Sequence, residues 1–304
     1  MHHLQRPDWL LTSQGQPRGH VQPARLDELW FHTGTNCNLR CPFCLEGSRP
    51  GDQRVQMPTL AEVAPFIAEA LALGVKEFSF TGGEPFVNPE LVAMLESALA
   101  HRPCLVLTNA TEPLRNRLAQ LAPLAEQPHR LHFRVSLDYP DAARHDAGRG
   151  PGAFAQSLRC LGELHRRGFG TSIARLGAKG EDATAVHAAY RPHFAAAGLP
   201  EETRIVVFPD FHRPGDQPAV PEITESCLSK YLSAPQRDRL MCNFSKMIVK
   251  QGGRMGVYAC TLVDDDPDYC LAATLREAMA ARVMLRHHRC FSCFSCGASC
   301  SELA

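Results

Sequence analysis

Three cysteines lie close together near the N-terminus, and their number is the first chemical clue. Cys37, Cys41 and Cys44 follow the pattern C-x3-C-x2-C, directly after a short strand-forming run. A structural zinc ion or a saturated iron–sulfur cluster takes four protein ligands. A [4Fe–4S] cluster held by three thiolates keeps one iron open to an outside ligand, so the spacing predicts a reactive site. A three-cysteine zinc knuckle is the alternative.

The composition favours metal ligands over disulfides for these thiols. The chain has 304 residues and 13 cysteines, an odd number, and no apolar run long enough for a secretory signal or a membrane span. We therefore expect a soluble, cytoplasmic protein whose cysteines stay reduced. Its 32 basic residues balance 32 acidic ones. Because no net charge would attract a polyanion, we expect neither nucleic acid nor a membrane as a partner.

Alternating strand-like and helix-like segments predict how these residues are positioned. Strand candidates cover residues 29–34, 77–83, 104–110, 131–138, 171–176 and 204–211. Amphipathic stretches separate them, and one of these, residues 59–74, begins with a capping box of Thr59 and Glu62. Such alternation predicts an α/β fold with a parallel sheet. Six units predict a partial, open (β/α)6 TIM-like barrel, because a closed barrel has eight.

The predicted domains follow from where this alternation stops. A Pro/Gly-rich linker lies near residue 215, and the segment after it is dense in cysteine. We expect an N-terminal extension over residues 1–27, the partial barrel over 28–215 and a small cysteine-rich domain over 216–304. Polar motifs follow the first four strands of the barrel, and the carboxyl ends of parallel strands form the binding edge of such sheets.

The pair of motifs "CNLRCPFC" and "FTGGEP" resembles the radical S-adenosylmethionine (SAM) superfamily. The family signature is C-x3-C-x-aromatic-C, with Phe43 as the aromatic residue, and the resemblance spans about residues 28–211. It implies a [4Fe–4S] cluster on the three cysteines, with SAM chelating the open iron. It further implies reductive cleavage of SAM to a 5′-deoxyadenosyl radical, which abstracts a hydrogen atom from the substrate. A flavodoxin- or ferredoxin-type electron donor is the implied partner.

The resemblance also implies which residues hold SAM. Gly82, Gly83, Glu84 and Pro85 match the loop that binds the SAM amino group. Glycines there permit close approach of the backbone, and the Glu84 carboxylate would offset the ammonium charge. A simple turn is the alternative for this loop taken alone.

Residues after later strands complete the implied SAM site. Thr108 and Asn109 resemble a "TN" pair near SAM, and Ser136 and Asp138 resemble residues that face the methionyl carboxylate or ribose. Arg149, in the run "RHDAGRGPGAF", would fork onto the SAM carboxylate with two hydrogen bonds. Ordinary strand-end and helix-capping roles are the alternatives.

A second set of cysteines lies in the C-terminal third. Its candidate ligands are Cys242, Cys260, Cys270, Cys290, Cys293, Cys296 and Cys300. The last four have the spacing of a ferredoxin run, and "KQGGRMGVYA" predicts a hairpin that brings Cys242 and Cys260 together. The arrangement resembles SPASM and twitch domains, which hold two or one auxiliary [4Fe–4S] clusters.

The thiolate count bounds the auxiliary clusters. We expect at least one, built from Cys242, Cys260 and two of Cys290, Cys293 and Cys300. A second closed cluster requires eight thiolates, which exist only if Cys227 and Cys270 both serve. A zinc ribbon is the alternative, because zinc accepts the same spacings.

Three functional classes remain open from the sequence. The leading hypothesis is a radical SAM enzyme acting on a small molecule, since only 28 residues precede the first strand and a leader-peptide domain needs more. A maturase of a ribosomally made peptide, delivered by a separate protein, is the second. A non-catalytic iron–sulfur carrier or scaffold is the third, although a carrier gains nothing from a three-ligand site. Tyr139, Asp210 and His212 lie near strand ends and are candidates to reach the substrate.

Overall fold

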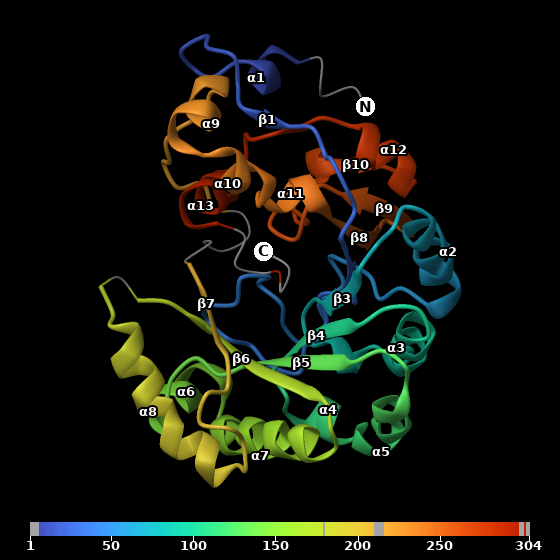
Figure 1. The fold of residues 1–304 in the computed structure, drawn as a ribbon, viewed down its shortest axis with the longest axis vertical. Coiled ribbons are helices and arrows are strands. Elements are labelled where there is room, and N and C mark those ends of the chain that lie inside the picture. The colour runs from blue at the N-terminus through green and yellow to red at the C-terminus, as the bar shows by residue number, and fades with distance from the viewer. Residues whose placement is uncertain (1–5, 179, 210–215, 298–300, 302–304) are drawn as a thin grey trace.

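The computed structural model describes residues 6–178, 180–209, 216–297 and 301. Its centre is a nine-stranded sheet with helices along the outside (Figure 1). The strand order is β10-β9-β8-β2-β3-β4-β5-β6-β7. The sheet is therefore a curved array with β10 and β7 at its edges in the described part of the chain.

Six strands that follow one another in the chain pair in parallel, each with the next. They are β2 (Glu28–His32), β3 (Glu77–Thr81), β4 (Cys104–Thr108), β5 (Leu131–Ser136), β6 (Gly170–Leu176) and β7 (Ile205–Phe208). This confirms the predicted α/β fold with six strands in chain order. Residues 210 and 211 of the last predicted strand lie outside the described residues.

Helices cover the outer face of the parallel strands. The longer ones are α2 (Leu60–Ala72), α3 (Leu91–Leu99), α7 (Ala153–Arg166) and α8 (Ala183–Ala196). Shorter ones are α4 (Glu112–Arg115), α5 (Leu118–Leu121), α6 (Ala142–Arg149), η2 (Pro85–Val87) and η3 (Ala122–Glu126). The predicted capping box of Thr59 and Glu62 begins α2. No helix in the described ranges combines the length and apolar character that crossing a membrane requires.

Aromatic side chains hold the sheet to these helices. Phe31 of β2, Phe78 and Phe80 of β3, and Phe133 of β5 are fully buried. The Phe31 and Phe80 rings lie 5.3 Å apart between centroids. Each buried ring contributes about 1.5–3 kcal/mol of hydrophobic stabilisation, so this layer fixes the strand ends that carry the polar motifs.

The C-terminal segment extends the same sheet. β8 (Ser245–Gln251) pairs in parallel with β2, and β9 (Arg254–Tyr258) returns antiparallel to it. The turn residues Gly252 and Gly253 have φ of 56° and 74°, which two-residue hairpins require. The predicted glycine hairpin is therefore present. β10 (Cys270–Ala272) completes the edge. The domain boundary near residue 215 stays a prediction.

The N-terminal residues pack on this C-terminal segment (Figure 1). β1 (His20–Val21) pairs with β11 (Val283–Met284), and Trp9 of α1 (Pro7–Leu10) lies 5.1 Å from the Tyr269 ring. The remaining elements are α9 (Glu225–Tyr231), α10 (Ala234–Asp238), α11 (Met241–Phe244), η4 (Pro267–Tyr269), α12 (Leu275–Ala280) and α13 (His288–Cys296).

Candidate active site

One cavity at the carboxyl ends of the parallel strands gathers most of the predicted site. Cys37, Cys41, Phe43 and Cys44 line it from the loop after β2. The other predicted residues that line it are Gly82, Gly83, Thr108, Asn109, Ser136, Asp138 and Arg149. The structure thus brings together motifs that are far apart in the sequence, and their individual roles stay predictions.

Hydrogen bonds from the backbone N–H groups shape the cysteine loop. The Cys37 N–H donates to the Arg49 carbonyl at 3.3 Å, and the Cys44 N–H donates to the Cys41 carbonyl at 3.2 Å. The Leu39 N–H points at the Cys37 sulfur, 3.4 Å away. Cys37 is 8% exposed, whereas the other two thiols are half-buried. The loop therefore presents three sulfurs toward one enclosed space.

The spacing of these sulfurs fits a cluster better than a zinc ion. Among the described residues, only His32, Glu46 and Asp264 bring three potential ligand atoms within 4.8 Å of one another, so the three thiols are spread more widely. Zinc with bonds of about 2.3 Å needs sulfurs about 3.8 Å apart. A [4Fe–4S] cluster binds each thiolate through a different iron and spreads its ligands. Burial raises the pKa of Cys37 to about 12, and metal binding would offset that cost.

His32, Glu46 and Asp264 do not form a metal site of their own. His32 Nε2 lies 3.3 Å from Glu46 and 3.5 Å from Asp264. However, the Gly34 N–H donates to His32 Nδ1 at 3.1 Å. Because Nδ1 accepts, Nε2 must carry the ring hydrogen and lacks the lone pair that a metal requires. His32 of β2 hydrogen-bonds to Glu46 of the cysteine loop, and Asp264 of the C-terminal segment lies close to the same ring nitrogen without a hydrogen-bond partner in the described residues.

Glu84 faces the protein interior and does not line the cavity. Its Oε1 accepts hydrogen bonds from Thr108 Oγ1 at 2.8 Å and from the Phe86 N–H at 3.1 Å, and its Oε2 accepts the Asn109 N–H at 2.8 Å. Burial raises its pKa to about 7, and the three donors act in the opposite direction. In this structure Glu84 holds the loop after β3 to the end of β4. Pro85 begins η2 and does not line the cavity either.

Asp138 and Arg149 form an ion pair in the cavity wall. Arg149 Nε donates to Asp138 Oδ2 at 2.5 Å, and Nη2 donates to Oδ1 at 3.3 Å. Burial acts to lower the pKa of Arg149, but the Asp138 carboxylate outweighs it, and the pKa is raised. Both Arg149 nitrogens thus bind Asp138 in this structure, and the predicted fork of Arg149 onto the SAM carboxylate stays a prediction. Buried His145 accepts the Asp138 N–H through Nδ1 at 3.2 Å.

Two glycines allow neighbouring elements to approach the cysteine loop. A Cβ on Gly83 would lie 2.5 Å from the Asn36 carbonyl oxygen, and a Cβ on Gly148 of α6 would lie 2.3 Å from the Phe43 ring. The Arg149 guanidinium lies 5.7 Å from the centre of the same ring. Phe43 therefore packs between the loop and α6 at the cavity wall.

Sequence reasoning missed the apolar part of the cavity. The additional lining residues include Trp30, Leu107, Leu176, Phe208, Leu262 and Arg289. The lining residues on the strands could have been found from the sequence, because they lie on predicted strands next to predicted site residues. Leu262 and Arg289 carried no such signal, because only the tertiary fold brings them here. Tyr139 lines a different cavity, with Arg144 4.2 Å from its ring centre. Asp210 and His212 lie outside the described residues.

Four cysteines of the second set surround a single enclosed cavity. They are Cys242 of α11, Cys260 after β9, and Cys290 and Cys293 of α13, and all four are buried. No three of these described thiols lie within 4.8 Å of one another, and the zinc ribbon stays the alternative to a cluster here. Leu262 and Arg289 line both this cavity and the first one. The two cysteine sites therefore share a wall.

The other candidate ligands do not join this group. Cys270 lies on β10 against Gly256 of β9, Cys296 is exposed at the end of α13, and Cys227 of α9 lies 3.1 Å from Thr224 Oγ1. Cys300 lies outside the described residues. The structure therefore provides four converging thiols for one auxiliary cluster, and a second cluster stays an untested prediction.

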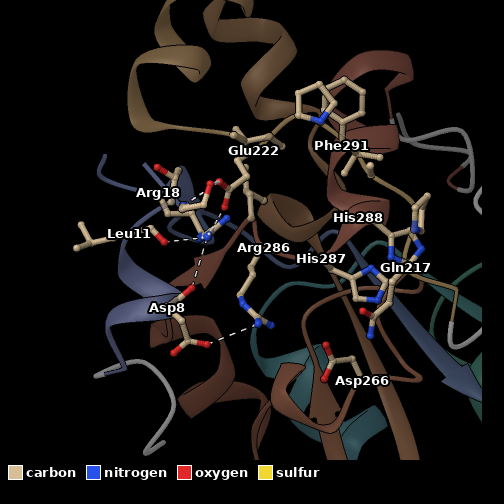
Figure 2. A pocket seen from close by; sticks show the side chains of 18 of the residues that line it. Asp8, Leu11, Arg18, Gln217, Glu222, Asp266, Arg286, His287, His288 and Phe291 are labelled. Carbon is tan, nitrogen blue, oxygen red and sulfur yellow. Dashed lines mark hydrogen bonds and ion pairs between the residues drawn. The ribbon is translucent and has the colours of Figure 1, made fainter. Parts of the chain in front are cut away.

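A larger cavity, of about 910 Å³, lies between the N-terminal residues and the start of α13 (Figure 2), and Leu285 lines both it and the cavity of the four cysteines. Figure 2 shows Arg18 reaching Glu222 and the Leu11 carbonyl, both at 2.8 Å. Arg286 pairs with Asp8 at 3.5 Å. Because these charged groups already pair with one another and no cysteine lines the cavity, its size alone does not make it the active site.

Comparison with known proteins agrees with this geometry. The sequence model of the Radical SAM superfamily matches residues 31–191. A GTP 3′,8-cyclase of Synechococcus elongatus is 35% identical over 129 residues, which cover 41% of this chain and 38% of that protein. The mycofactocin maturase MftC of Mycolicibacterium smegmatis is 31% identical over 133 residues, 44% of this chain and 33% of that protein. The chain thus matches less than half the length of these relatives.

Solved structures share the fold at low sequence identity. SuiB of Streptococcus suis bound to the precursor peptide SuiA has a TM-score of 0.61 and 13% identity, over 84% of this chain and 65% of that one. The protein anSMEcpe with bound AdoMet has a TM-score of 0.59 and 14% identity, over 88% and 82%. Because the family model covers more than half of the sequence, this chain belongs to the radical SAM superfamily and is an enzyme of the kind that uses a [4Fe–4S] cluster and SAM.

Proposed function

We propose that this enzyme cleaves SAM reductively at a [4Fe–4S] cluster held by Cys37, Cys41 and Cys44 and abstracts a hydrogen atom from a small-molecule substrate. Bound together, cluster and SAM supply a 5′-deoxyadenosyl radical. The observation that carries the proposal is the single cavity that the three thiols share with Gly82, Gly83 and the Asp138–Arg149 pair. Three thiols leave one iron for the methionyl part of SAM.

The chain's own residues orient SAM and exclude water. The backbone at Gly82 and Gly83 is open to close approach, which suits the SAM amino group. Asp138 faces the cavity already paired with Arg149, so it is held in one orientation for the ribose or methionyl group. Glu84 acts as a positioning residue, because it fixes Thr108 and Asn109 without reaching the cavity.

We further propose one auxiliary cluster on Cys242, Cys260, Cys290 and Cys293. These four thiols converge on one cavity, and four ligands saturate a [4Fe–4S] cluster. The wall of Leu262 and Arg289 separates this site from the apolar side of the SAM cavity. Arg289 Nη2 donates to the Leu45 carbonyl, beside Cys44, at 3.0 Å. A substrate bound against Leu262 would therefore lie between the two clusters, where an electron released by its oxidation can be accepted.

A peptide substrate is the second candidate. It is favoured by the likeness to SuiB, which is solved with its precursor peptide, and by the similarity to the maturase MftC. The similarity to GTP 3′,8-cyclase favours the small molecule. Deuterium transfer from labelled candidate substrates into 5′-deoxyadenosine separates the two, since only the true substrate donates its hydrogen to the radical. A flavodoxin- or ferredoxin-type protein is the proposed electron donor.

Formation of 5′-deoxyadenosine tests the proposal. The protein is reconstituted with iron and sulfide without oxygen and mixed with SAM and dithionite. We expect 5′-deoxyadenosine from the wild type and from Cys270→Ala, whose thiol lies apart from both sites. We expect none from Cys41→Ala. Equal product from Cys41→Ala would contradict the assignment of the cluster.

A further inference from the structure

Lys246 is a buried lysine whose positive charge is not neutralised by a neighbouring carboxylate in the described ranges. It lies on β8 and is 0% exposed. Its Nζ donates to the carbonyls of Cys242 at 2.8 Å and Ser245 at 2.9 Å. Within the described ranges, no carboxylate forms an ion pair with it. A buried ammonium without an anion is costly, because two carbonyl groups replace only part of its hydration.

One of the residues in contact with Lys246 is a cysteine of the second site, whose thiol can become anionic. The Lys246 ammonium contacts the backbone of Cys242, which lines the four-thiol cavity. An ordinary explanation of these contacts exists, since Cys242 lies within the four-residue helix α11 and Ser245 is its C-cap, and a lysine can cap a helix by binding its last carbonyls.

We propose that Lys246 is the counter-charge of the metal–thiolate centre held by Cys242, Cys260, Cys290 and Cys293 and raises its reduction potential. This inference rests on the proposed auxiliary cluster. Four thiolates around a [4Fe–4S]2+ core carry a net charge of −2, and one added electron makes it −3. A nearby buried cation stabilises the more negative state more strongly, so it favours reduction.

The test isolates the auxiliary cluster. The protein is full-length, with Cys37, Cys41 and Cys44 all changed to alanine. Its iron and sulfide are first counted. The remaining cluster is then titrated with dithionite, and electron paramagnetic resonance measures how much of it is reduced. With Lys246→Met in this background we expect at least a tenfold shift of the equilibrium toward the oxidised state, which is about 59 mV for one electron. Lys246→Arg keeps the positive charge, so its auxiliary cluster should keep a reduction potential close to that of the parent protein.

A matched control removes a lysine from the same strand. Lys250 lies four residues along β8 and pairs with Glu62 at 2.7 Å. Lys250→Met should leave the auxiliary potential unchanged, because this ammonium is already neutralised by its own carboxylate. A general effect of losing a charge on β8 would instead move both variants alike and would overturn the inference.

Thermal stability distinguishes a counter-charge from a helix cap, because the two roles predict different changes in Tm. Without iron, Lys246→Met removes an uncompensated buried charge and should raise the Tm. With the cluster bound, the same change removes the counter-charge and should lower the Tm. A lysine that only caps α11 would lower the Tm in both states. If the methionine variant does not fold, Lys246→Gln replaces it in the same comparison with Lys246→Arg.

The outcomes separate this inference from the function on which it rests. No iron in the triple-alanine background with Lys246 intact would refute the auxiliary cluster itself. A loaded cluster whose potential is the same with lysine, arginine, glutamine and methionine at this position would overturn the counter-charge and leave the cluster standing. The counter-charge role is supported if the auxiliary cluster has a lower reduction potential in Lys246→Met and Lys246→Gln and a potential near that of the parent in Lys246→Arg.

Discussion

Replacing Glu84 with glutamine tests how the cavity wall is held together. The carboxylate accepts three hydrogen bonds, from Thr108 Oγ1, the Asn109 N–H and the Phe86 N–H. Glutamine has one oxygen, so in either orientation its amide NH₂ faces at least one of these donors. A buried donor left without a partner costs about 1–3 kcal/mol. We therefore expect Glu84→Gln to lower the free energy of unfolding by about that amount.

The assay is urea unfolding of the iron-free protein at pH 8.5. This pH lies above the pKa of about 7 to which burial raises Glu84, so the wild-type carboxylate is ionised. Glu90→Gln is the matched control, because Glu90 Oε2 accepts a single hydrogen bond, from the Leu60 N–H at 2.7 Å. A glutamine oxygen can replace that acceptor, and we expect a change within about 0.5 kcal/mol.

A direct contact between Glu84 and the SAM ammonium predicts the opposite pattern. Glu84→Gln would then unfold like the wild type in the absence of SAM and would bind SAM more weakly once the cluster is loaded. That result would refute the positioning role derived from the three hydrogen bonds. It would restore the role that the family resemblance implies.

Three further changes probe the cavity wall and the opposite end of the sheet. Asp138→Asn leaves the Arg149 guanidinium buried without its anion and should cost about 3–5 kcal/mol in urea unfolding; a loss under about 1 kcal/mol would show that the pair does not support the wall. Gly148→Ala drives a methyl group into the Phe43 ring and should destabilise the protein by about 1–3 kcal/mol. Adding Phe43→Leu should relieve part of this, and a double variant no more stable than Gly148→Ala would disprove the clash. Burial, and then the neighbouring Glu28 carboxylate, raise the pKa of Glu77 from 4.5 to about 8. The stability that depends on its protonated form is present below pH 4.5 and is lost as pH rises through about 8. Relative to the wild type, Glu77→Gln should therefore gain stability between pH 5 and pH 9, and a constant difference across that range would contradict the raised pKa.

The parallel sheet and its motif-bearing edge were predictable because local signals agree. Strand-forming runs end at or shortly before Cys37, Gly82, Thr108 and Ser136, and each intervening helix brings the next strand back to the same side of the sheet. The hairpin of β8 and β9 was predictable from Gly252 and Gly253. These features depend on residues that are close in sequence.

Features that depend on long-range contacts were not predictable. The pairing of β8 with β2 joins segments about 200 residues apart in sequence, and nothing in either segment specifies the other. Leu262 and Arg289 were not predictable as cavity residues for the same reason, because only the tertiary fold brings them to the cavity wall. The hydrogen bonds of Glu84 were not predictable either, because its donors, Thr108 Oγ1 and the Asn109 N–H, come from another strand end; its predicted contact with the SAM ammonium stays a prediction.

The most direct test of the account is the electron paramagnetic resonance spectrum of the reduced N-terminal cluster with and without SAM. It is recorded on protein in which Cys242, Cys260, Cys290 and Cys293 are changed to serine, so that only the three-cysteine site contributes. The account predicts about four irons per chain and a spectrum that shifts when SAM is added, because SAM occupies the iron that no thiolate binds. A site that holds zinc, or a cluster whose spectrum is unchanged by SAM, would contradict it.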